Sequence, residues 1–114
     1  MTKIYSMLGL AQKAGKISSG MLAAKSSLIR RRAHLLLMSN DIAENTKEVL
    51  VSTCQKVNIP WAILGNKYEL GASVGKAYRV AVTVNDKKMA TAILDVLRGM
   101  GDKIESMGVV EWPK

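Results

Sequence analysis

The sequence predicts an α/β fold: a three-layer α/β/α sandwich in which helices cover both faces of a small, mixed, partly parallel four-stranded sheet. Segments with helical spacing of apolar residues alternate with short apolar runs typical of single strands. The run from 35 to 38 is apolar without alternation, the pattern of a strand buried on both faces. The length of 114 residues, 48% of them hydrophobic, suits one compact domain.

The N-terminal third begins with an amphipathic helix predicted over residues 3–14. A short edge strand is expected at 16–17, and a second helix over about 20–31. A hydroxyl of Ser18 or Ser19 can cap that helix, because it can accept from the free amides of the first turn. The buried strand beginning at residue 34 follows.

The middle of the chain predicts a third helix, capped by Asp41 and ended by Asn58 and Pro60. Cys54 lies on the apolar stripe of this helix, which favours a small core residue over a nucleophile. Residues 61–64 form the next apolar strand.

Asn66 followed by Glu69 resembles a capping box and predicts a short fourth helix that ends near Gly75. Residues 78–84 are rich in β-branched side chains and predict the fourth strand.

Asn85 or Asp86 then caps a last helix with the clearest apolar stripe in the sequence. The composition changes after residue 98, where glycines recur. We therefore expect a domain over 1–98 and a C-terminal appendage over 99–114, with Trp112 docked back on the domain as the simplest outcome.

Charge is distributed unevenly along the chain. The 17 Lys and Arg against 9 Asp and Glu give a net charge of +8. Residues 1–40 contain seven basic residues and no acidic one, whereas residues 41–114 are nearly neutral. A polyanion such as RNA is the partner that this pattern favours; a solvated basic surface is the alternative.

The sequence lacks the residues and motifs that several other classes of protein require. With Cys54 and His34 each alone, the chain cannot form an intrachain disulfide or supply a cluster of Cys and His ligands for a metal. Neither a P-loop nor a dinucleotide-binding glycine motif is present, so no cofactor and no small-molecule substrate are expected. Without a signal peptide or an apolar run long enough to span a membrane, we expect a cytoplasmic protein.

Catalysis is not expected either. Asp41 with Glu44, or Asp95 with Glu105, could form an acid/base pair, but helix capping and solvated helix faces explain these carboxylates. His34 opens a buried strand, where a structural imidazole is expected.

The segment from Lys13 to Gly20 is the candidate binding motif, because it places lysines, hydroxyls and glycines at the loops bordering the second helix. The amides at the helix start, together with Ser18, Ser19 and the amide of Gly20, can donate to phosphate oxygens. Lys13, Lys16, Lys25 and Arg30, Arg31 and Arg32 would add positive charge on the same surface. Lys25 falls within the apolar arc of this helix, so either part of that arc is exposed at a binding surface, or the arc packs in the core and the Lys25 stem extends over it to reach solvent.

Dispersed segments together resemble the family of the archaeal large-subunit seven-Ae and eukaryotic thirty-e ribosomal proteins, particularly its small bacterial members. These are αβα-sandwich proteins that bind kink-turn or related RNA. The matching segments, in the family's order and spacing, are residues 8–16, 19–20, 33–41, 45–46, 59–60, 68–71 and 74–76, followed by the strand through 84.

The resemblance implies where RNA would sit. In the family, the kinked RNA meets the loop before the second helix and the start of that helix, and an extruded base rests on the loop after the fourth helix. The implied positions here are Lys16, Ser18, Ser19, Gly20, Lys25 and Ser26, then Gly75, Lys76 and Tyr78, with Asn40 and Asp41 at the neighbouring strand end.

The chain departs from the family where kink-turn readers carry an Asn-Glu pair. Leu22 and Ala23 stand there, and they cannot hydrogen-bond base edges, so positioning on phosphates is better preserved than direct readout. The sequence thus predicts a non-catalytic protein that binds structured, kink-turn-like RNA, with ribosomal RNA and the ribosome as candidate partners. The alternative is a protein–protein interaction module that keeps the fold and has lost this readout.

Overall fold

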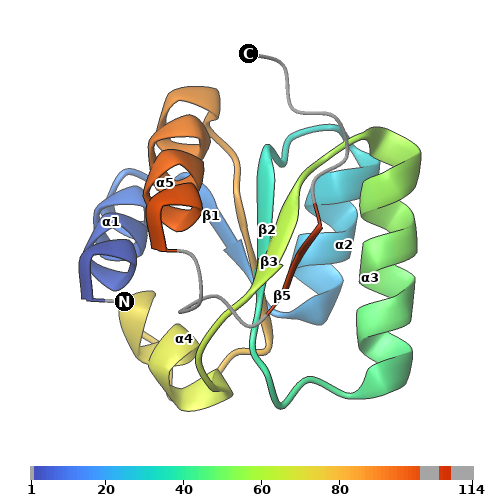
Figure 1. Cartoon of the computed structure of the whole chain (residues 1–114), viewed down its shortest axis with the longest axis horizontal. Coiled ribbons are helices and arrows are strands. Elements are labelled where there is room, and N and C mark those ends of the chain that lie inside the picture. Colours follow the sequence, from blue (N-terminus) through green and yellow to red (C-terminus); the bar gives the residue numbers. More distant parts are fainter. Residues whose placement is uncertain (1, 101–105, 109–114) are drawn as a thin grey trace.

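The computed structural model describes residues 2–100 and 106–108 as helices, strands and loops (Figure 1). The described helices and strands follow one another in the order α1 (Thr2–Lys13), β1 (Ile17–Ser19), α2 (Met21–Ile29), β2 (Leu35–Met38), α3 (Glu44–Val57), β3 (Trp61–Ile63), α4 (Lys67–Ser73), β4 (Ala81–Val84), α5 (Lys87–Met100) and β5 (Ser106–Gly108).

The strands form one mixed sheet in the order β1-β4-β2-β3-β5. β2 and β3 run parallel, with Leu37 opposite Ala62, and the other neighbouring pairs are antiparallel. The predicted mixed, partly parallel sheet is confirmed. β5 is an additional strand beside β3, and it lies within the segment predicted as an appendage.

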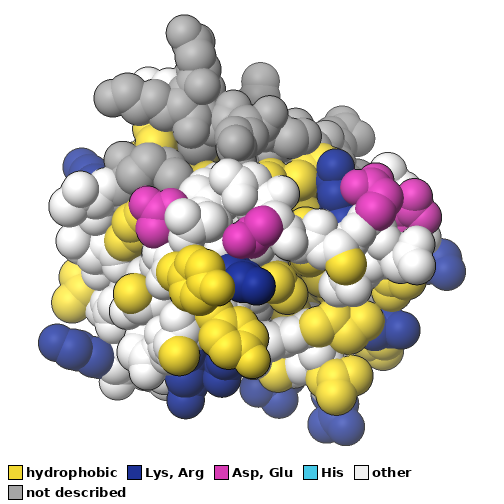
Figure 2. Space-filling view, turned by 90° about the horizontal axis from the view of Figure 1, so that it is seen from below, with side chains coloured by type: hydrophobic (Ala, Val, Ile, Leu, Met, Phe, Trp, Pro, Cys, Tyr) yellow, Lys and Arg dark blue, Asp and Glu magenta, His cyan; other side chains and the backbone are white. Residues whose placement is uncertain are grey.

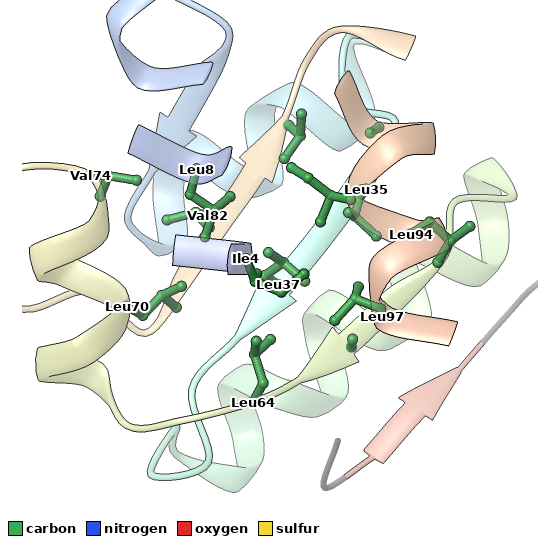
Figure 3. Packing of buried hydrophobic residues seen from close by; sticks show 14 residues of the cluster. Ile4, Leu8, Leu35, Leu37, Leu64, Leu70, Val74, Val82, Leu94 and Leu97 are labelled. Carbon is green, nitrogen blue, oxygen red and sulfur yellow. The ribbon is translucent and has the colours of Figure 1, made fainter. Parts of the chain in front are cut away.

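Helices cover both faces of the sheet, with α1, α4 and α5 on one side and α2 and α3 on the other (Figure 1). The two faces explain the continuous apolar run of β2, because successive side chains of a strand point to opposite faces. Leu35 and Leu37 pack in the core with α1, α4 and α5 (Figure 3), whereas Leu36 and Met38 pack in the core with α2 and α3.

The helix ends test the predicted caps. The capping box of α4 is confirmed, because Asn66 Oδ1 accepts from the backbone N–H groups of Tyr68 and Glu69, and Glu69 Oε1 accepts from the backbone N–H of Asn66. Asp86, one of two residues predicted to cap α5, accepts from the Met89 N–H through Oδ2 at 3.0 Å.

The predicted caps of α2 and α3 are wrong. The N-cap of α2 is Gly20, without a side-chain hydrogen bond, because Ser18 and Ser19 belong to strand β1. The N-cap of α3 is Ala43, and Asp41 Oδ1 instead accepts from the N–H of Lys67 in α4.

The strand predicted over 78–84 is shorter in the structure. Its ladder with β2 begins where Ala81 faces Met38, and residues 78–80 form a loop over α4. Trp112 lies outside the described residues, so its docking stays a prediction. Among the helices that the structure describes, none has both the length and the apolar character needed to cross a membrane.

Candidate nucleic-acid interface

The loops gather at two opposite edges of the sheet. At one edge, which we call the Gly20 edge, the chain passes through Ser19–Met21, Ser39–Asp41, Gly65–Tyr68 and Tyr78–Val80. At the other, the Lys16 edge, it passes through Lys13–Lys16, Arg30–His34 and Asn85–Lys88. These two edges are at the bottom and the top of Figure 1, respectively.

Hydrogen bonds at the two ends of β4 show that Gly20 and Lys16 lie at opposite edges. The Gly20 N–H donates to the Ala81 carbonyl at the first residue of β4, whereas the Asn85 N–H donates to the Lys16 carbonyl beyond its last. Four strand residues separate the two edges, which is about 13 Å at the usual rise per residue.

Backbone and side-chain hydrogen bonds join the loops of the Gly20 edge. The Asn40 N–H donates to the Gly65 carbonyl at 2.8 Å, and the Arg79 N–H donates to the Lys67 carbonyl at 2.9 Å. Asp41 ties the loop after β2 to α4 by accepting from the Lys67 N–H at 3.1 Å. The edge is therefore a connected unit built from four segments far apart in sequence.

The start of α2 is open at this edge. Gly20 has φ of 97°, which a residue with a side chain rarely adopts, and it turns the chain from β1 into the helix. Because no side chain caps α2, its first-turn amides and the positive end of its dipole are suited to an anionic group. The Gly20 N–H was predicted to donate to a phosphate oxygen. It donates instead to the Ala81 carbonyl, at 2.8 Å.

Arg79 lies next to this helix start. Its Nε donates to Ser19 Oγ at 3.3 Å, and its Nη1 donates to the Tyr78 carbonyl at 2.7 Å. The guanidinium, Ser19, Gly20 and Tyr78 help to line a pocket of about 250 Å³. A fixed cation thus stands beside free helix amides, an arrangement that suits a phosphate.

Two exposed tyrosines and a lysine form the other part of the edge. Tyr68 and Tyr78 are 60% and 56% exposed. Lys67 Nζ lies 5.4 Å from the ring centroid of Tyr68 and 5.7 Å from that of Tyr78, within cation–π range of both. Figure 2 looks onto this end of the molecule, where hydrophobic and basic side chains lie side by side. The exposed rings can stack with planar groups such as bases.

Gly71 in α4 allows the Tyr78 loop to pack so closely. A Cβ at Gly71 would lie 2.5 Å from the Cα of Tyr78 and 2.8 Å from its backbone nitrogen. The Lys76 N–H also donates to the Gly71 carbonyl, and Gly75, with φ of 74°, turns the chain out of α4. The position of Tyr78 is therefore set by backbone packing.

The outer face of α2 continues the Gly20 edge. Leu22 is 81% exposed, and Ala23 and Ser26 are exposed beside it, whereas Leu28 is buried. Of the two alternatives for the apolar arc, partial exposure is confirmed. Lys25 is half-buried and lines a groove between α2 and α3.

The structure does not bring all the predicted residues together. Ser18 faces inward: its Oγ accepts from Asn85 Nδ2 at 2.9 Å and lies 2.8 Å from Ser27 Oγ, so this hydroxyl is used within the fold. Lys13, Lys16 and Arg30–Arg32 are all exposed, but they lie at the Lys16 edge. The prediction of one surface around the second helix is wrong in this respect, because β1 separates Lys16 from Gly20.

Sequence reasoning missed Lys67, Tyr68 and Arg79. The capping box placed Lys67 and Tyr68 in the first turn of a helix, but nothing local to the sequence showed that this turn meets the loop after α4. Arg79 looked like part of a strand.

Cys54 is buried in the core. Burial raises the pKa of the Cys54 thiol from 9.0 to about 12, so the thiol stays protonated at neutral pH, and the prediction of a core residue is confirmed. Within the described part of the chain, no group of three or more His, Cys, Asp and Glu residues is placed to hold a metal ion.

Comparisons with known proteins agree with the fold and with the resemblance. Two similar proteins are each named RNA-binding protein YlxQ. The one from Bacillus subtilis (strain 168) is 31% identical over 93 residues, which cover 82% of this chain and 93% of that protein. The one from Enterococcus faecium is 27% identical over 78 residues, covering 68% and 76%.

Solved structures share the architecture. A protein with unknown function from Bacillus halodurans C superposes with a TM-score of 0.82 at 28% identity, covering 86% of this chain and 99% of that one. A Giardia lamblia 15.5kD RNA binding protein superposes with a TM-score of 0.72, covering 87% and 88%; its 16% identity supports a common fold only. The family model for the ribosomal protein L7Ae/L30e/S12e/Gadd45 family matches residues 2–94. This chain therefore belongs to the ribosomal protein L7Ae/L30e/S12e/Gadd45 family.

Proposed function

We propose that this chain binds structured RNA through the Gly20 edge and acts by binding, without catalysis. The observation that carries the proposal is the uncapped start of α2 beside Arg79, with exposed Tyr68 and Tyr78 next to it. Helix amides and a guanidinium suit phosphate oxygens, and the tyrosine rings suit an unstacked base. The family membership and the names of the YlxQ relatives support the same partner.

The RNA would be recognised by its shape more than by its base edges. Leu22 and Ala23 occupy the exposed start of α2, and their side chains have no hydrogen-bonding groups. A bent or kinked RNA fits such a site, because a bend brings backbone phosphates to α2 while a base outside the stack reaches Tyr78. We therefore propose a kink-turn-like bend as the target, with ribosomal RNA as its source and Asn40, Gly75 and Lys76 as further contacts.

The direct test compares two RNAs of equal length, one with a kink-turn and one with the same stems joined as a straight duplex. The full chain should bind the kinked RNA at least tenfold more tightly at 100 mM salt. Equal affinities would contradict recognition of the bend, and no binding to either RNA would contradict the proposed function as a whole.

Two single variants locate the contact. Tyr78→Ala should weaken binding of the kinked RNA by about tenfold, because stacking of one base contributes about 1–3 kcal/mol. Lys67→Gln should weaken it less and reduce the salt dependence. Arg98→Gln is the control, because it also removes one positive charge, from an exposed position in the last turn of α5 that lies outside the four segments of the Gly20 edge. If Arg98→Gln has the same effect as Lys67→Gln, only overall charge matters.

A protein–protein module is the second candidate, favoured by the exposed Leu22 and Ile29 on α2. Crosslinking in cells, followed by sequencing of the attached RNA, separates the two functions. The proposal predicts reproducible recovery of a few structured RNAs, and ribosomal RNA among them would support ribosome association. Recovery of protein crosslinks without RNA would support the module instead.

A further inference from the structure

The Lys16 edge carries a second concentration of positive charge, separate from the proposed site. Its segments 13–16, 30–34 and 85–88 contain seven basic residues and one acidic residue, Asp86. All seven basic side chains are exposed; they are Lys13, Lys16, Arg30, Arg31, Arg32, Lys87 and Lys88. The carboxylate of Asp86 is half-buried and accepts from the Met89 N–H.

Backbone hydrogen bonds at the ends of three neighbouring strands bring these segments together. The Asn85 N–H donates to the Lys16 carbonyl at 2.7 Å, and the His34 N–H donates to the Val84 carbonyl at 2.8 Å. Because β4 lies between β1 and β2, the beginnings of β1 and β2 are about 10 Å apart at the usual strand spacing. Adjacent phosphates along a nucleic-acid strand are separated by distances of the same order, so several cations can contact one backbone.

Helix dipoles account for only part of this charge: they favour Lys13 in the last turn of α1 and Arg30 at the C-cap of α2, but not the cations at the start of α5. Lys87 and Lys88 are the first two residues of α5, where the positive end of the helix dipole disfavours cations. Arg31 has φ of 60°, a left-handed conformation in which Gly or Asn is the usual residue, and it stands between two further arginines. A bound polyanion would relieve both the repulsion among these cations and the unfavourable dipole contact.

The chemistry of the edge favours a phosphate backbone over bases or an apolar protein surface. The large exposed hydrophobic side chains of residues 2–100 are Leu10, Leu22, Ile29, Val49, Tyr68 and Tyr78. None of them belongs to the three segments of the Lys16 edge, and only Ile29 adjoins one of them, so a partner there would meet mainly charge, without an exposed aromatic platform.

We propose that the Lys16 edge is a second RNA surface, which holds the phosphate backbone of another duplex segment while the Gly20 edge holds the bend. The inference rests on the proposed RNA function but places a contact at the opposite end of the sheet. The molecule measures 30 × 29 × 29 Å. Its two ends can therefore contact two RNA segments at the same time, and one chain can hold these segments together.

The experiment uses the full chain, a matched pair of double variants and two RNA probes. Arg30→Gln/Lys87→Gln removes one Arg and one Lys from the Lys16 edge. Lys3→Gln/Arg98→Gln removes the same two residue types from exposed positions at the distant ends of α1 and α5. The probes are a plain 20-base-pair RNA duplex and a kinked RNA too short to reach beyond the Gly20 edge. Thermal unfolding confirms that both variants fold.

Salt titrations give the result. For the plain duplex, Arg30→Gln/Lys87→Gln should reduce the slope of log K against log salt by about 1.4 to 1.8, because each lost phosphate contact contributes about 0.7 to 0.9. Affinity at 100 mM salt should fall at least tenfold. Binding of the short kinked RNA should change less than threefold, and the control variant should leave the duplex slope within 0.5 of the unmodified chain.

Other results overturn the inference, and they are distinguishable from failure of the proposed function. If the short kinked RNA binds but duplex binding is unchanged by Arg30→Gln/Lys87→Gln, the Lys16 edge is not an RNA surface. If Arg30→Gln/Lys87→Gln lowers the affinity for both RNAs by the same factor, these charges act from a distance and no second surface exists. If polyglutamate of equal charge binds as tightly as the duplex, the edge fits an acidic protein. If neither RNA binds the unmodified chain, the proposed function itself is wrong.

Discussion

The two edges of the sheet differ in how they are built, although both face solvent. The Gly20 edge consists of loops locked to one another by backbone hydrogen bonds, with two tyrosines, one lysine and one arginine held in defined positions. Backbone hydrogen bonds also join the segments of the Lys16 edge, but what this edge presents to solvent is seven exposed basic side chains. A surface of the first kind can select a shape, whereas a surface of the second kind supplies affinity that depends on salt.

The largest effect should come from disturbing the rigid packing of the Gly20 edge. Gly71→Ala places a Cβ about 2.5 Å from the Cα of Tyr78, so α4 and the Tyr78 loop must separate. We expect a loss of about 3 kcal/mol in the free energy of unfolding and weaker binding of the kinked RNA, without a change in duplex binding at the Lys16 edge. Urea denaturation and the two RNA titrations measure these effects.

The control for this variant is Gly99→Ala. A Cβ at Gly99 meets nothing within 4 Å, and the residue lies in a helix, so alanine there should be neutral or stabilising by up to about 1 kcal/mol. Equal losses for the two variants would show that close packing at Gly71 is not the cause.

A second prediction concerns Cys54, which lies in the core. Changing this residue should alter stability without altering binding at either edge. Burial raises the pKa of the Cys54 thiol to about 12, so the folded chain retains a proton that the unfolded chain releases above about pH 9. The contribution of Cys54 is fully present below pH 9 and is lost as the pH rises toward 12. The free energy of unfolding should therefore fall by up to about 1.4 kcal/mol per pH unit in that range.

Cys54→Ala should remove this part of the pH dependence. Urea denaturation at pH 8, 9 and 10 gives the pH dependence of the free energy of unfolding for each chain, and the difference between the two slopes isolates the contribution of Cys54. Binding at either edge at pH 7 should be unaffected by this variant. Identical slopes for the two chains would contradict the buried neutral thiol.

A third prediction tests the hydrogen bonds that hold α4 at the Gly20 edge. Asn66→Ala removes the acceptor for two amides in the first turn of α4, which should cost about 1 kcal/mol of stability. The same change should weaken kinked-RNA binding, because Lys67 and Tyr68 lie in that turn. Asn66→Asp keeps an accepting oxygen and should restore most of the stability; if it behaves as the alanine variant does, the cap has no such role.

The smallest effect is expected at the Lys16 edge, and it has the opposite sign. Lys88→Glu places a carboxylate near the positive end of the α5 dipole, so the free energy of unfolding should rise by about 0.3–1 kcal/mol at low salt. Duplex binding should weaken in the same variant. The gain in stability should disappear in 1 M salt, and a loss of stability at low salt would show that Lys88 has a structural role instead.

The sequence predicted local structure better than the spatial grouping of charge. Asn66 with Glu69 predicted a capping box, and the structure has it, because both partners lie within one helical turn. Asp41 was assigned to the helix that follows it, yet it bonds to Lys67, 26 residues away in sequence. A carboxylate near a helix start can accept from any amide that the fold brings to it, and local sequence does not show which one.

The same limit explains the candidate site. Lys16 and Gly20 are four residues apart, and a loop would have kept them together. A three-residue strand, Ile17–Ser19, carries the chain across the sheet instead. The sequence therefore showed correctly that positive charge is concentrated in residues 1–40. It did not show that this segment contributes to two opposite edges of the sheet. Strand β5 was not predicted, because a three-residue segment containing glycine has little strand pattern of its own.

The short strand β5 has a consequence for how copies of the protein behave at high concentration. Strand edges with unpaired backbone groups are templates for pairing between molecules, and long flat edges promote aggregation. By covering β3, β5 leaves β1 and β5, each of three residues, as the outer strands among those that the structure describes. Brief outer strands provide few consecutive free amides for a neighbouring copy, so this arrangement limits edge-to-edge association during synthesis and storage.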